Sequence, residues 1–424
     1  METKCILFLG GGIACRGLYV AVLAICGTMK PSYKTFTALL FSTMISTAYT
    51  SPSLVFSNFD NRARNGESLC VIFLGGSLTW GAQSTNPMET SYRALVEKKL
   101  LATYPGAHFR FWDAAIGGTG SQLASFRLER DVLTKKPDLV FLEFTINDDP
   151  YPEPSPSRLA SYESLVRRLV QAGIPVVQVI LPAKKDVLSN PPGRPLDPKH
   201  KEISAAYGLP VADAVALVKQ RVAEGKITPN QLWDLPEDGT HPGDAGYALY
   251  AEAAWSAFEH AVSAKSQCQI PEKMIHAETY MTVNRFRLAS IPHLPEGWAP
   301  GKPHRNAVAF DFVCSRWMED LVIAGANAAP LRLKVQASDI MIFGEMTKKS
   351  GSFQVRVDGG QPKVISARCA DGNMRLVAMI AERLDSSREH EIEILPDLKP
   401  DEELRIESVC AAGAPATVSL GASK

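Results

Sequence analysis

The sequence has no excess of charge of either sign. Its 424 residues contain 45 Lys and Arg against 45 Asp and Glu, so the formal net charge is zero. Neither nucleic acid nor an anionic membrane is therefore expected as a general partner. Hydrophobic residues make up 46% and charged residues 21% of the chain, as in ordinary globular proteins. The length exceeds what one core usually holds, which predicts two domains and additional segments.

Closely spaced cysteine pairs are also absent. Three of the eight cysteines lie in the first 28 residues, and the other five are widely separated: Cys70, Cys268, Cys314, Cys369 and Cys410. Without CxxC spacing, the pattern excludes an obvious zinc knuckle or redox pair. We expect no metal and no cofactor, and the sequence leaves disulfide pairing open.

The first fifty residues differ from the remainder. From Met29 the chain reads MKPSYKTFTALLFSTMISTAYTSPS, with two lysines, a short apolar run over 36–45 and small residues near Ala48. This order is typical of a secretory signal peptide. We expect residues 1–50 to be a leader that truly starts at Met29, and the mature protein to be secreted or periplasmic. A membrane anchor is the alternative, but the apolar run is short for a span of roughly 20 residues, so no stable membrane insertion of the mature chain is expected.

The next part of the chain alternates between two patterns. Apolar runs typical of strands occur at 69–74, 108–112, 138–144, 174–181 and 209–213, and helical spacing occurs at 91–104, 121–133 and 159–173. Continuous apolar strands separated by helices predict a parallel sheet covered on both faces. We assign residues 60–265 to this α/β domain. Polar loops at 75–81, 115–120 and 145–150 each follow a strand, where such sheets bind ligands.

The pattern changes after about residue 265. Residues 352–367 alternate between apolar and polar side chains and turn at Asp358-Gly359-Gly360, a hairpin signal. Further short strands are expected at 307–313, 331–337, 390–395 and 403–409, without intervening helices. Residues 270–424 are therefore predicted to form an antiparallel β-sandwich.

The stretch VIFLGGSLTWGAQS at 71–84 places Ser77 on a glycine turn after a strand. A phosphate loop is excluded because Ala82-Gln83 follow Gly81 where Lys and Ser or Thr are needed. The dinucleotide pattern GxGxxG is absent, and Thr79 replaces the last glycine of the α/β-hydrolase elbow GxSxG. A nucleophilic serine remains, and it requires a base and an acid to orient that base.

His241 is the candidate base. It lies in DLPEDGTHPGDAGYALYAEAAW at 234–255, three residues after Asp238, in a loop that precedes an amphipathic helix. His108, His200 and His260 are interpreted as surface or packing residues, and the other four histidines fall in the second domain, where no companion serine motif occurs. Gly118 in AAIGGTGSQ and Asn147 in FTIND follow two other strands and offer an N–H and a side-chain amide to an oxyanion.

These four loops together resemble the SGNH hydrolases, also called the GDSL esterase/lipase family. The family's four blocks correspond here to Gly75-Gly76-Ser77-Leu78, to Gly118, to Asn147 and to the run from Asp238 to Pro242. The resemblance covers residues 68–262. It implies a flavodoxin-like three-layer α/β/α fold with a five-stranded parallel sheet, and hydrolysis of acyl esters without a metal.

The same resemblance implies a role for each residue of the site. Ser77 would be the nucleophile, His241 the general base and then acid, and Asp238 the orienting carboxylate. The Ser77 and Gly118 N–H groups and the Asn147 amide would form the oxyanion hole. One departure is Gly76, where the family usually carries aspartate. Additional acids near the site are expected to brace loops or bind water: Glu143, Asp148 and Asp149.

The sequence therefore predicts a secreted serine esterase that removes small acyl groups, foremost acetyl, from carbohydrate through an acyl-enzyme. An acylated carbohydrate or another small ester is the expected partner, and the oligomeric state stays open. The alternatives are a lipase, lysophospholipase or O-acyltransferase of the same family, and an inactive carbohydrate-binding protein. The β-sandwich has three open roles: to bind glycan, to close over the site, or to stabilise the protein.

Overall fold

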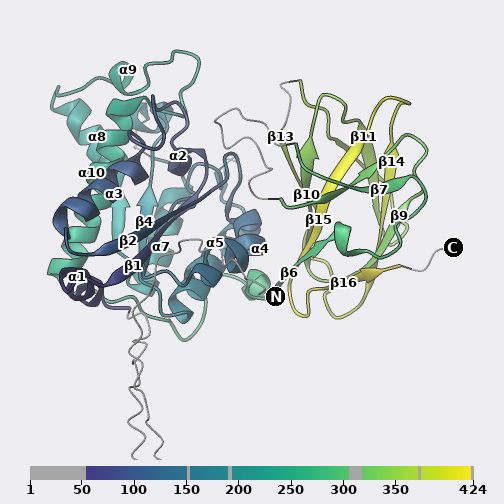
Figure 1. The fold of residues 1–424 in the computed structure, drawn as a ribbon, viewed down its shortest axis with the longest axis horizontal. Helices are drawn as coiled ribbons and strands as arrows, with labels where there is room; N and C mark the ends of the chain where they lie inside the picture. The colour runs from purple at the N-terminus through teal and green to yellow at the C-terminus, as the bar shows by residue number, and fades with distance from the viewer. Residues whose placement is uncertain (1–53, 150–152, 190–192, 305–317, 371–373, 422–424) are drawn as a thin grey trace, which may run out of the picture. The chain divides into compact units, whose positions relative to one another are not determined.

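The computed structural model describes residues 54–149, 153–189, 193–304, 318–370 and 374–421 (Figure 1). The leader expected at 1–50, with its start at Met29, lies outside the described residues. So do the strand expected at 307–313 and four of the cysteines: Cys5, Cys15, Cys26 and Cys314.

A five-stranded parallel sheet forms the centre of the α/β domain, with the order β2-β1-β3-β4-β5. The strands are β1 (Ser68–Gly75), β2 (His108–Ala115), β3 (Leu139–Leu142), β4 (Val176–Ile180) and β5 (Val211–Asp213). This is the flavodoxin-like order, so the predicted fold class and all five predicted strands are confirmed. In β1 every residue after Ser68 is buried, because helices cover both faces of the sheet.

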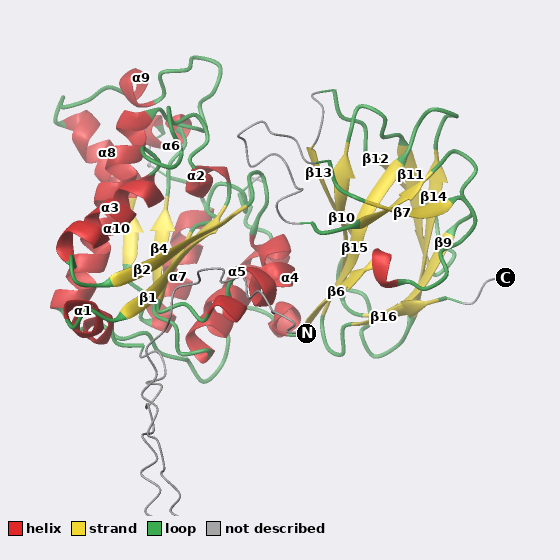
Figure 2. Ribbon diagram, viewed as in Figure 1, coloured by secondary structure: helices red, strands yellow, loops and turns green. Residues whose placement is uncertain are grey.

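Two groups of helices cover the sheet (Figure 2). The first group packs around α10 and contains α1 (Phe56–Arg64), α3 (Tyr92–Thr103), α8 (Ala214–Ala223) and α10 (Asp244–Ser263). The second packs around α5 and contains α4 (Ser121–Asp131), α5 (Pro156–Gln171) and α7 (Leu196–Tyr207). Three short helices lie in loops: α2 (Ser77–Trp80), α6 (Lys184–Leu188) and α9 (Pro229–Leu232). The three helices predicted from apolar spacing correspond to α3, α4 and α5.

The C-terminal part is an antiparallel β-sandwich, as predicted. One sheet has the order β13-β10-β15-β8-β7, with β6 also paired to β15, and the other has the order β12-β11-β14-β9-β16. The strands of the first sheet are β6 (Val283–Arg287), β7 (Trp298–Gly301), β8 (Leu321–Ala324), β10 (Asp339–Met346), β13 (Met374–Ala381) and β15 (Leu404–Ala412). Those of the second are β9 (Leu331–Gln336), β11 (Ser352–Val357), β12 (Lys363–Ser366), β14 (His390–Asp397) and β16 (Thr417–Leu420).

The hairpin between β11 and β12 turns where the sequence predicts it. Asp358 has φ of 52° and Gly359 has φ of 67°, the left-handed values of a tight hairpin turn. Between the two sheets, buried aliphatic side chains such as Ile342 of β10 and Ile392 of β14 form the sandwich core.

A separate cluster of buried side chains joins the two domains. Leu123 and Phe126 of α4 pack with Met341 and Phe343 of β10 and with Cys410 of β15.

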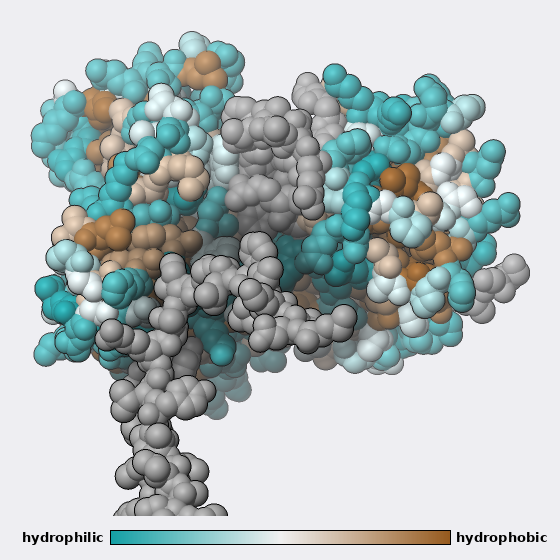
Figure 3. Space-filling model, viewed as in Figure 1, coloured by the Kyte–Doolittle hydropathy of each residue, from teal (hydrophilic) through white to brown (hydrophobic). Residues whose placement is uncertain are grey.

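The described surface seen in Figure 3 is mostly hydrophilic, with hydrophobic residues in small groups. Within the described ranges, no helix combines the length and the apolar character that crossing a membrane requires.

Candidate active site

Ser77 is presented by a turn that only glycine can form. Strand β1 ends at Gly75, where a Cβ atom would lie 2.1 Å from Thr79 Oγ1 and 2.7 Å from the Glu143 carbonyl oxygen. After Gly76 the chain enters α2, and the Gly76 carbonyl accepts the N–H groups of Thr79 and Trp80 at 3.1 Å. Ser77 therefore lies at the carboxyl end of a central strand of the sheet. Only 5% of the surface of this residue is exposed to solvent.

The loop before α10 brings His241 to this serine. His241 Nε2 lies 2.7 Å from Ser77 Oγ, and His241 Nδ1 lies 2.7 Å from Asp238 Oδ2. The other carboxylate oxygen of Asp238 accepts the N–H groups of Thr240 at 2.9 Å and of His241 at 3.0 Å. The carboxylate thereby shapes the loop in the manner of an Asx turn as well as contacting the ring.

The electrostatics of Asp238 suit an orienting carboxylate. Burial alone would raise its pKa, but the two backbone N–H groups and the His241 ring outweigh burial, so the pKa is lowered. An ionised carboxylate accepts the Nδ1–H of imidazole and leaves Nε2 with a lone pair directed at the serine hydroxyl. The arrangement can remove a proton from Ser77 as the hydroxyl attacks an electrophile.

The two expected oxyanion donors lie in the neighbouring loops. The Asn147 side chain lies against Gly76, where a Cβ atom would be 2.1 Å from Asn147 Oδ1. Gly118 lies in the loop after β2 and has φ of 64°. The carbonyl oxygen of the next residue, Thr119, would lie 3.7 Å from a Cβ atom at Gly76. The structure thus brings together Ser77, His241 and Asp238, and it places Asn147 and the loop of Gly118 beside the glycine turn.

Glu143 places a carboxylate at the glycine turn of the first block. Its carboxylate is fully buried and accepts hydrogen bonds from the backbone N–H groups of Ile146 and Gly76. The Thr145 hydroxyl also donates a hydrogen bond to it, at 3.2 Å. Burial raises the pKa of Glu143, while the charge of Arg194 and these hydrogen bonds act in the opposite direction. The side chain links the nucleophile turn to the loop that carries Asn147.

Gly76→Ala is expected to lower kcat by about 10², the effect of losing one oxyanion donor. The added methyl group would displace the Asn147 amide, because it would lie 2.1 Å from Asn147 Oδ1. Steady-state kinetics with p-nitrophenyl acetate measure this effect. Gly106→Ala is the control, since a Cβ atom there meets nothing within 4 Å. If Gly76→Ala lowers kcat further in an Asn147→Ala background, displacement of the amide is not the cause.

Two further acids hold neighbouring loops. Asp148 Oδ1 accepts the Ser121 N–H at 2.8 Å, at the first residue of α4, and burial raises the pKa of Asp148 to about 7. Asp149 lies 4.0 Å from Arg194, a buried side chain that the sequence analysis did not single out. Arg194 also pairs with Asp186 at 2.8 Å and Asp197 at 2.9 Å. Asp197 is a local partner, three residues after Arg194, but Asp186 and Asp149 come from other segments, so the sequence alone does not reveal the cluster.

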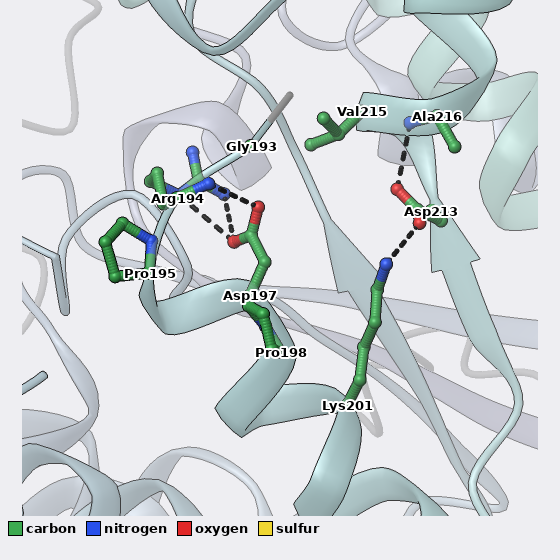
Figure 4. Close-up of a pocket in the computed structure, with 9 residues that line it drawn as sticks. All are labelled: Gly193, Arg194, Pro195, Asp197, Pro198, Lys201, Asp213, Val215 and Ala216. Carbon is green, nitrogen blue, oxygen red and sulfur yellow. Dashed lines mark hydrogen bonds and ion pairs between the residues drawn. The ribbon is translucent and has the colours of Figure 1, made fainter. Parts of the chain in front are cut away.

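A cavity of about 670 Å³ lies beside this arginine (Figure 4). In Figure 4 Arg194 points toward Asp197, and Lys201 points toward Asp213, with which it forms an ion pair of 2.5 Å. The lining residues include neither Ser77 nor His241. This cavity is therefore distinct from the position where an ester would meet the serine.

The remaining histidines that the structure describes near the sheet are packing or surface residues, as expected. His200 stacks on Tyr162 with ring centroids 3.7 Å apart, and burial lowers the pKa of His200 to about 3. His108 and His260 are exposed. In the described part of the chain, no group of three or more His, Cys, Asp or Glu side chains is arranged to hold a metal ion.

A serine hydroxyl hydrogen-bonded to an imidazole thus lies at the carboxyl edge of a flavodoxin-like sheet. Together with the similarities that follow, this site identifies a carboxylic ester hydrolase. Residues 73–249 match the family model of the GDSL-like Lipase/Acylhydrolase family.

Similar proteins cover one or both domains. An acetylxylan esterase from Geobacillus stearothermophilus is 28% identical over 208 residues, which are 45% of this chain and 92% of that esterase. A solved two-domain esterase active on acetylated mannans, co-crystallised with mannopentaose, superimposes with a TM-score of 0.70 at 24% identity. The match covers 85% of this chain and 95% of that one, and a second structure of a two-domain esterase active on acetylated mannans gives a TM-score of 0.69. This likeness shows the two-domain fold.

Proposed function

We propose that the protein is an exported esterase that removes acetyl groups from polysaccharide, with Ser77, His241 and Asp238 as its catalytic triad. The observation that carries the proposal is the chain of two 2.7 Å contacts from Ser77 Oγ through the imidazole to the Asp238 carboxylate. Export is supported by the basic and apolar order of residues after Met29.

In the proposed reaction, Ser77 Oγ attacks the acetyl carbonyl carbon while His241 Nε2 takes the hydroxyl proton. The bond from the carbonyl carbon to the sugar oxygen then breaks, and His241 returns the proton to that oxygen. Water then attacks the acetyl carbonyl carbon while His241 Nε2 takes a proton from the water. The bond from that carbon to Ser77 Oγ breaks, His241 returns the proton to Ser77 Oγ, and acetate leaves. The N–H groups of Ser77 and Gly118 and the amide of Asn147 hold the negative oxygen in both tetrahedral intermediates.

Acetylated polysaccharide is supported as substrate by the relatives. The acetylxylan esterase resembles the α/β domain, and the esterase active on acetylated mannans has the same two-domain fold. Both names describe esterases of acetylated polysaccharides, although the sugar differs. The proposal therefore specifies the acyl group and the class of polymer, and leaves the sugar to experiment.

Two assays test this substrate class. With p-nitrophenyl esters from C2 to C12, we expect kcat/KM to be greatest at C2. Acetylated xylan and acetylated mannan should each be assayed for acetate release, with the chemically deacetylated polymers as controls. An optimum at C8 or longer without acetate release would favour the lipase or lysophospholipase alternative. Acetyl transfer to an added sugar in preference to water would favour the acyltransferase.

A further inference from the structure

A charged residue of the β-sandwich reaches the oxyanion loop of the α/β domain. An ideal Cβ atom at Gly118 would lie 1.8 Å from Nη2 of Arg375, 2.7 Å from its Cζ and 3.0 Å from its Nε. The guanidinium therefore occupies the space that a side chain at position 118 would need. From standard covalent geometry, Nη2 lies no more than about 4.3 Å from the Gly118 nitrogen.

The register of the first sheet explains why Arg375 faces the α/β domain. Strands β10 and β13 are antiparallel, with Phe343 opposite Val377 and Glu345 opposite Arg375. Alternate residues of a strand point to the same face, so Arg375 shares a face with Phe343, whose ring packs in the cluster that joins the domains. The opposite face, with Ile342, belongs to the sandwich core.

Helix α4 connects this face of the sheet to the oxyanion loop. It begins at Ser121, three residues after Gly118, and its Leu123 and Phe126 pack against β10 and β15. Hydrogen bonds add to the contact: Gln122 Nε2 donates to the Tyr280 hydroxyl at 3.1 Å, and Ser157 Oγ donates to Asp339 at 2.8 Å. These contacts hold α4, which follows the Gly118 loop, against β10, and β10 pairs with β13, the strand that carries Arg375.

An acidic residue, Glu345, lies opposite Arg375 in the sheet. Glu345, opposite Arg375, is fully buried, accepts Arg405 Nε at 2.9 Å and accepts the His304 N–H at 2.9 Å. A cation at the edge of the oxyanion loop acts on charge that develops there, and its effect is large where water is excluded.

We infer that Arg375 makes the β-sandwich part of the esterase site, by placing a fixed positive charge beside Gly118 that stabilises the oxyanion of the tetrahedral intermediates. The inference rests on the proposed function, since it requires an oxyanion at Gly118. It assigns the second domain an electrostatic role that applies to every ester substrate, independent of any sugar that the sandwich contacts. The charge stabilises the transition state more than the neutral bound ester, so it acts on kcat rather than on KM.

The test uses the full chain with p-nitrophenyl acetate, a neutral substrate without sugar. We expect Arg375→Met to lower kcat 10- to 100-fold while KM changes less than threefold, and Arg375→Lys, which keeps the charge, to stay within fivefold of the unchanged protein. Arg356→Met on β11, in the other sheet, is the matched control and should change kcat less than twofold. Thermal unfolding of every variant shows whether the fold is retained.

Chemical rescue separates charge from packing. Arg375→Ala should regain kcat when guanidinium chloride is added at low millimolar concentration, and Arg356→Ala should not respond. If Arg375→Met lowers the melting temperature, the kcat of Arg375→Gln and the rescue experiment are used instead to distinguish loss of charge from loss of packing. Equal losses in the Lys and Met variants without rescue would assign Arg375 a purely structural role, and an unchanged kcat in Arg375→Met would exclude any role in the chemistry. In both cases, loss of activity in Ser77→Ala still supports the proposed function. Failure of the Arg375 inference is therefore distinguishable from failure of the proposed function.

Discussion

Replacing Ser77 by alanine is expected to lower kcat for p-nitrophenyl acetate by at least about 10⁴, the typical effect of removing a triad nucleophile. The variant keeps the oxyanion donors and His241, but no oxygen remains to form the acyl-enzyme. Because the side chain is small and the residue is only 5% exposed, removal of one oxygen should leave the fold intact. Steady-state kinetics, together with acetate release from the acetylated polysaccharides, measure the loss.

Ser263→Ala is the matched control for this substitution. Ser263 is the last residue of α10, and its hydroxyl donates only to the carbonyl of His260 in the preceding turn. It should have the activity of the unchanged protein. A fluorophosphonate probe should label the unchanged protein and the control but not Ser77→Ala. Activity of Ser77→Ala within tenfold of the control would show that another group is the nucleophile.

Asp238→Asn is expected to lower kcat by about 10³ to 10⁴, because the amide changes the tautomer of His241. Asparagine can still accept the N–H groups of Thr240 and His241 through Oδ1, so the loop should keep its shape. Its NH₂ group would face Nδ1 and favour the tautomer that carries the proton on Nε2. That tautomer cannot take the Ser77 proton. Steady-state kinetics and thermal unfolding of the same preparation measure the two effects.

Asp244→Asn is the control for loss of a nearby negative charge. Asp244 lies at the start of α10 and binds Thr85 through both carboxylate oxygens, at 2.9 and 2.6 Å. We expect its kcat to fall less than fivefold. Because the pKa of Asp238 is already lowered in the folded protein, no limb of the pH–rate profile between pH 5 and 9 should belong to Asp238. Equal losses in both Asn variants would mean that charge, rather than imidazole orientation, is responsible.

Much of the fold follows from local patterns. The apolar run at 69–74 and the glycine turn after it predict a buried parallel strand that ends at a site, and β1 ends at Gly75. The hairpin at Asp358 is equally local, because a left-handed turn restricts which residues fit. Six strands of the sandwich lie outside the segments predicted from the sequence: β6, β7, β8, β10, β13 and β16. The longest of them are β10 and β13. Strand β10 packs against the α/β domain, and β13 lies at the edge of its sheet. They therefore lack the regular alternation of apolar and polar residues that a strand with one solvent-exposed face shows.

The surroundings of Gly76 could not be predicted from local sequence patterns. From the sequence, glycine in place of the family's aspartate is only a departure with an open effect. In the folded protein, Asn147 lies where a side chain at Gly76 would be, and Glu143 from the end of another strand binds the Gly76 N–H. A carboxylate is thus present at this turn, but it is supplied by a residue 67 positions away in the chain.

The sequence by itself determined the class of the sheet, the order of the four loops and the identity of Ser77, Asp238 and His241 as candidates. These features depend on short-range periodicity, on turn chemistry and on residue types that few reactions require. Only the tertiary structure decided that Glu143 holds the nucleophile turn, that Arg194 gathers three carboxylates, and that Arg375 of the second domain contacts Gly118. The contacts of Glu143 with Gly76, of Arg194 with Asp149 and of Arg375 with Gly118 join segments distant in sequence. Packing of the sheets and helices, which no local pattern encodes, selects which of these segments meet.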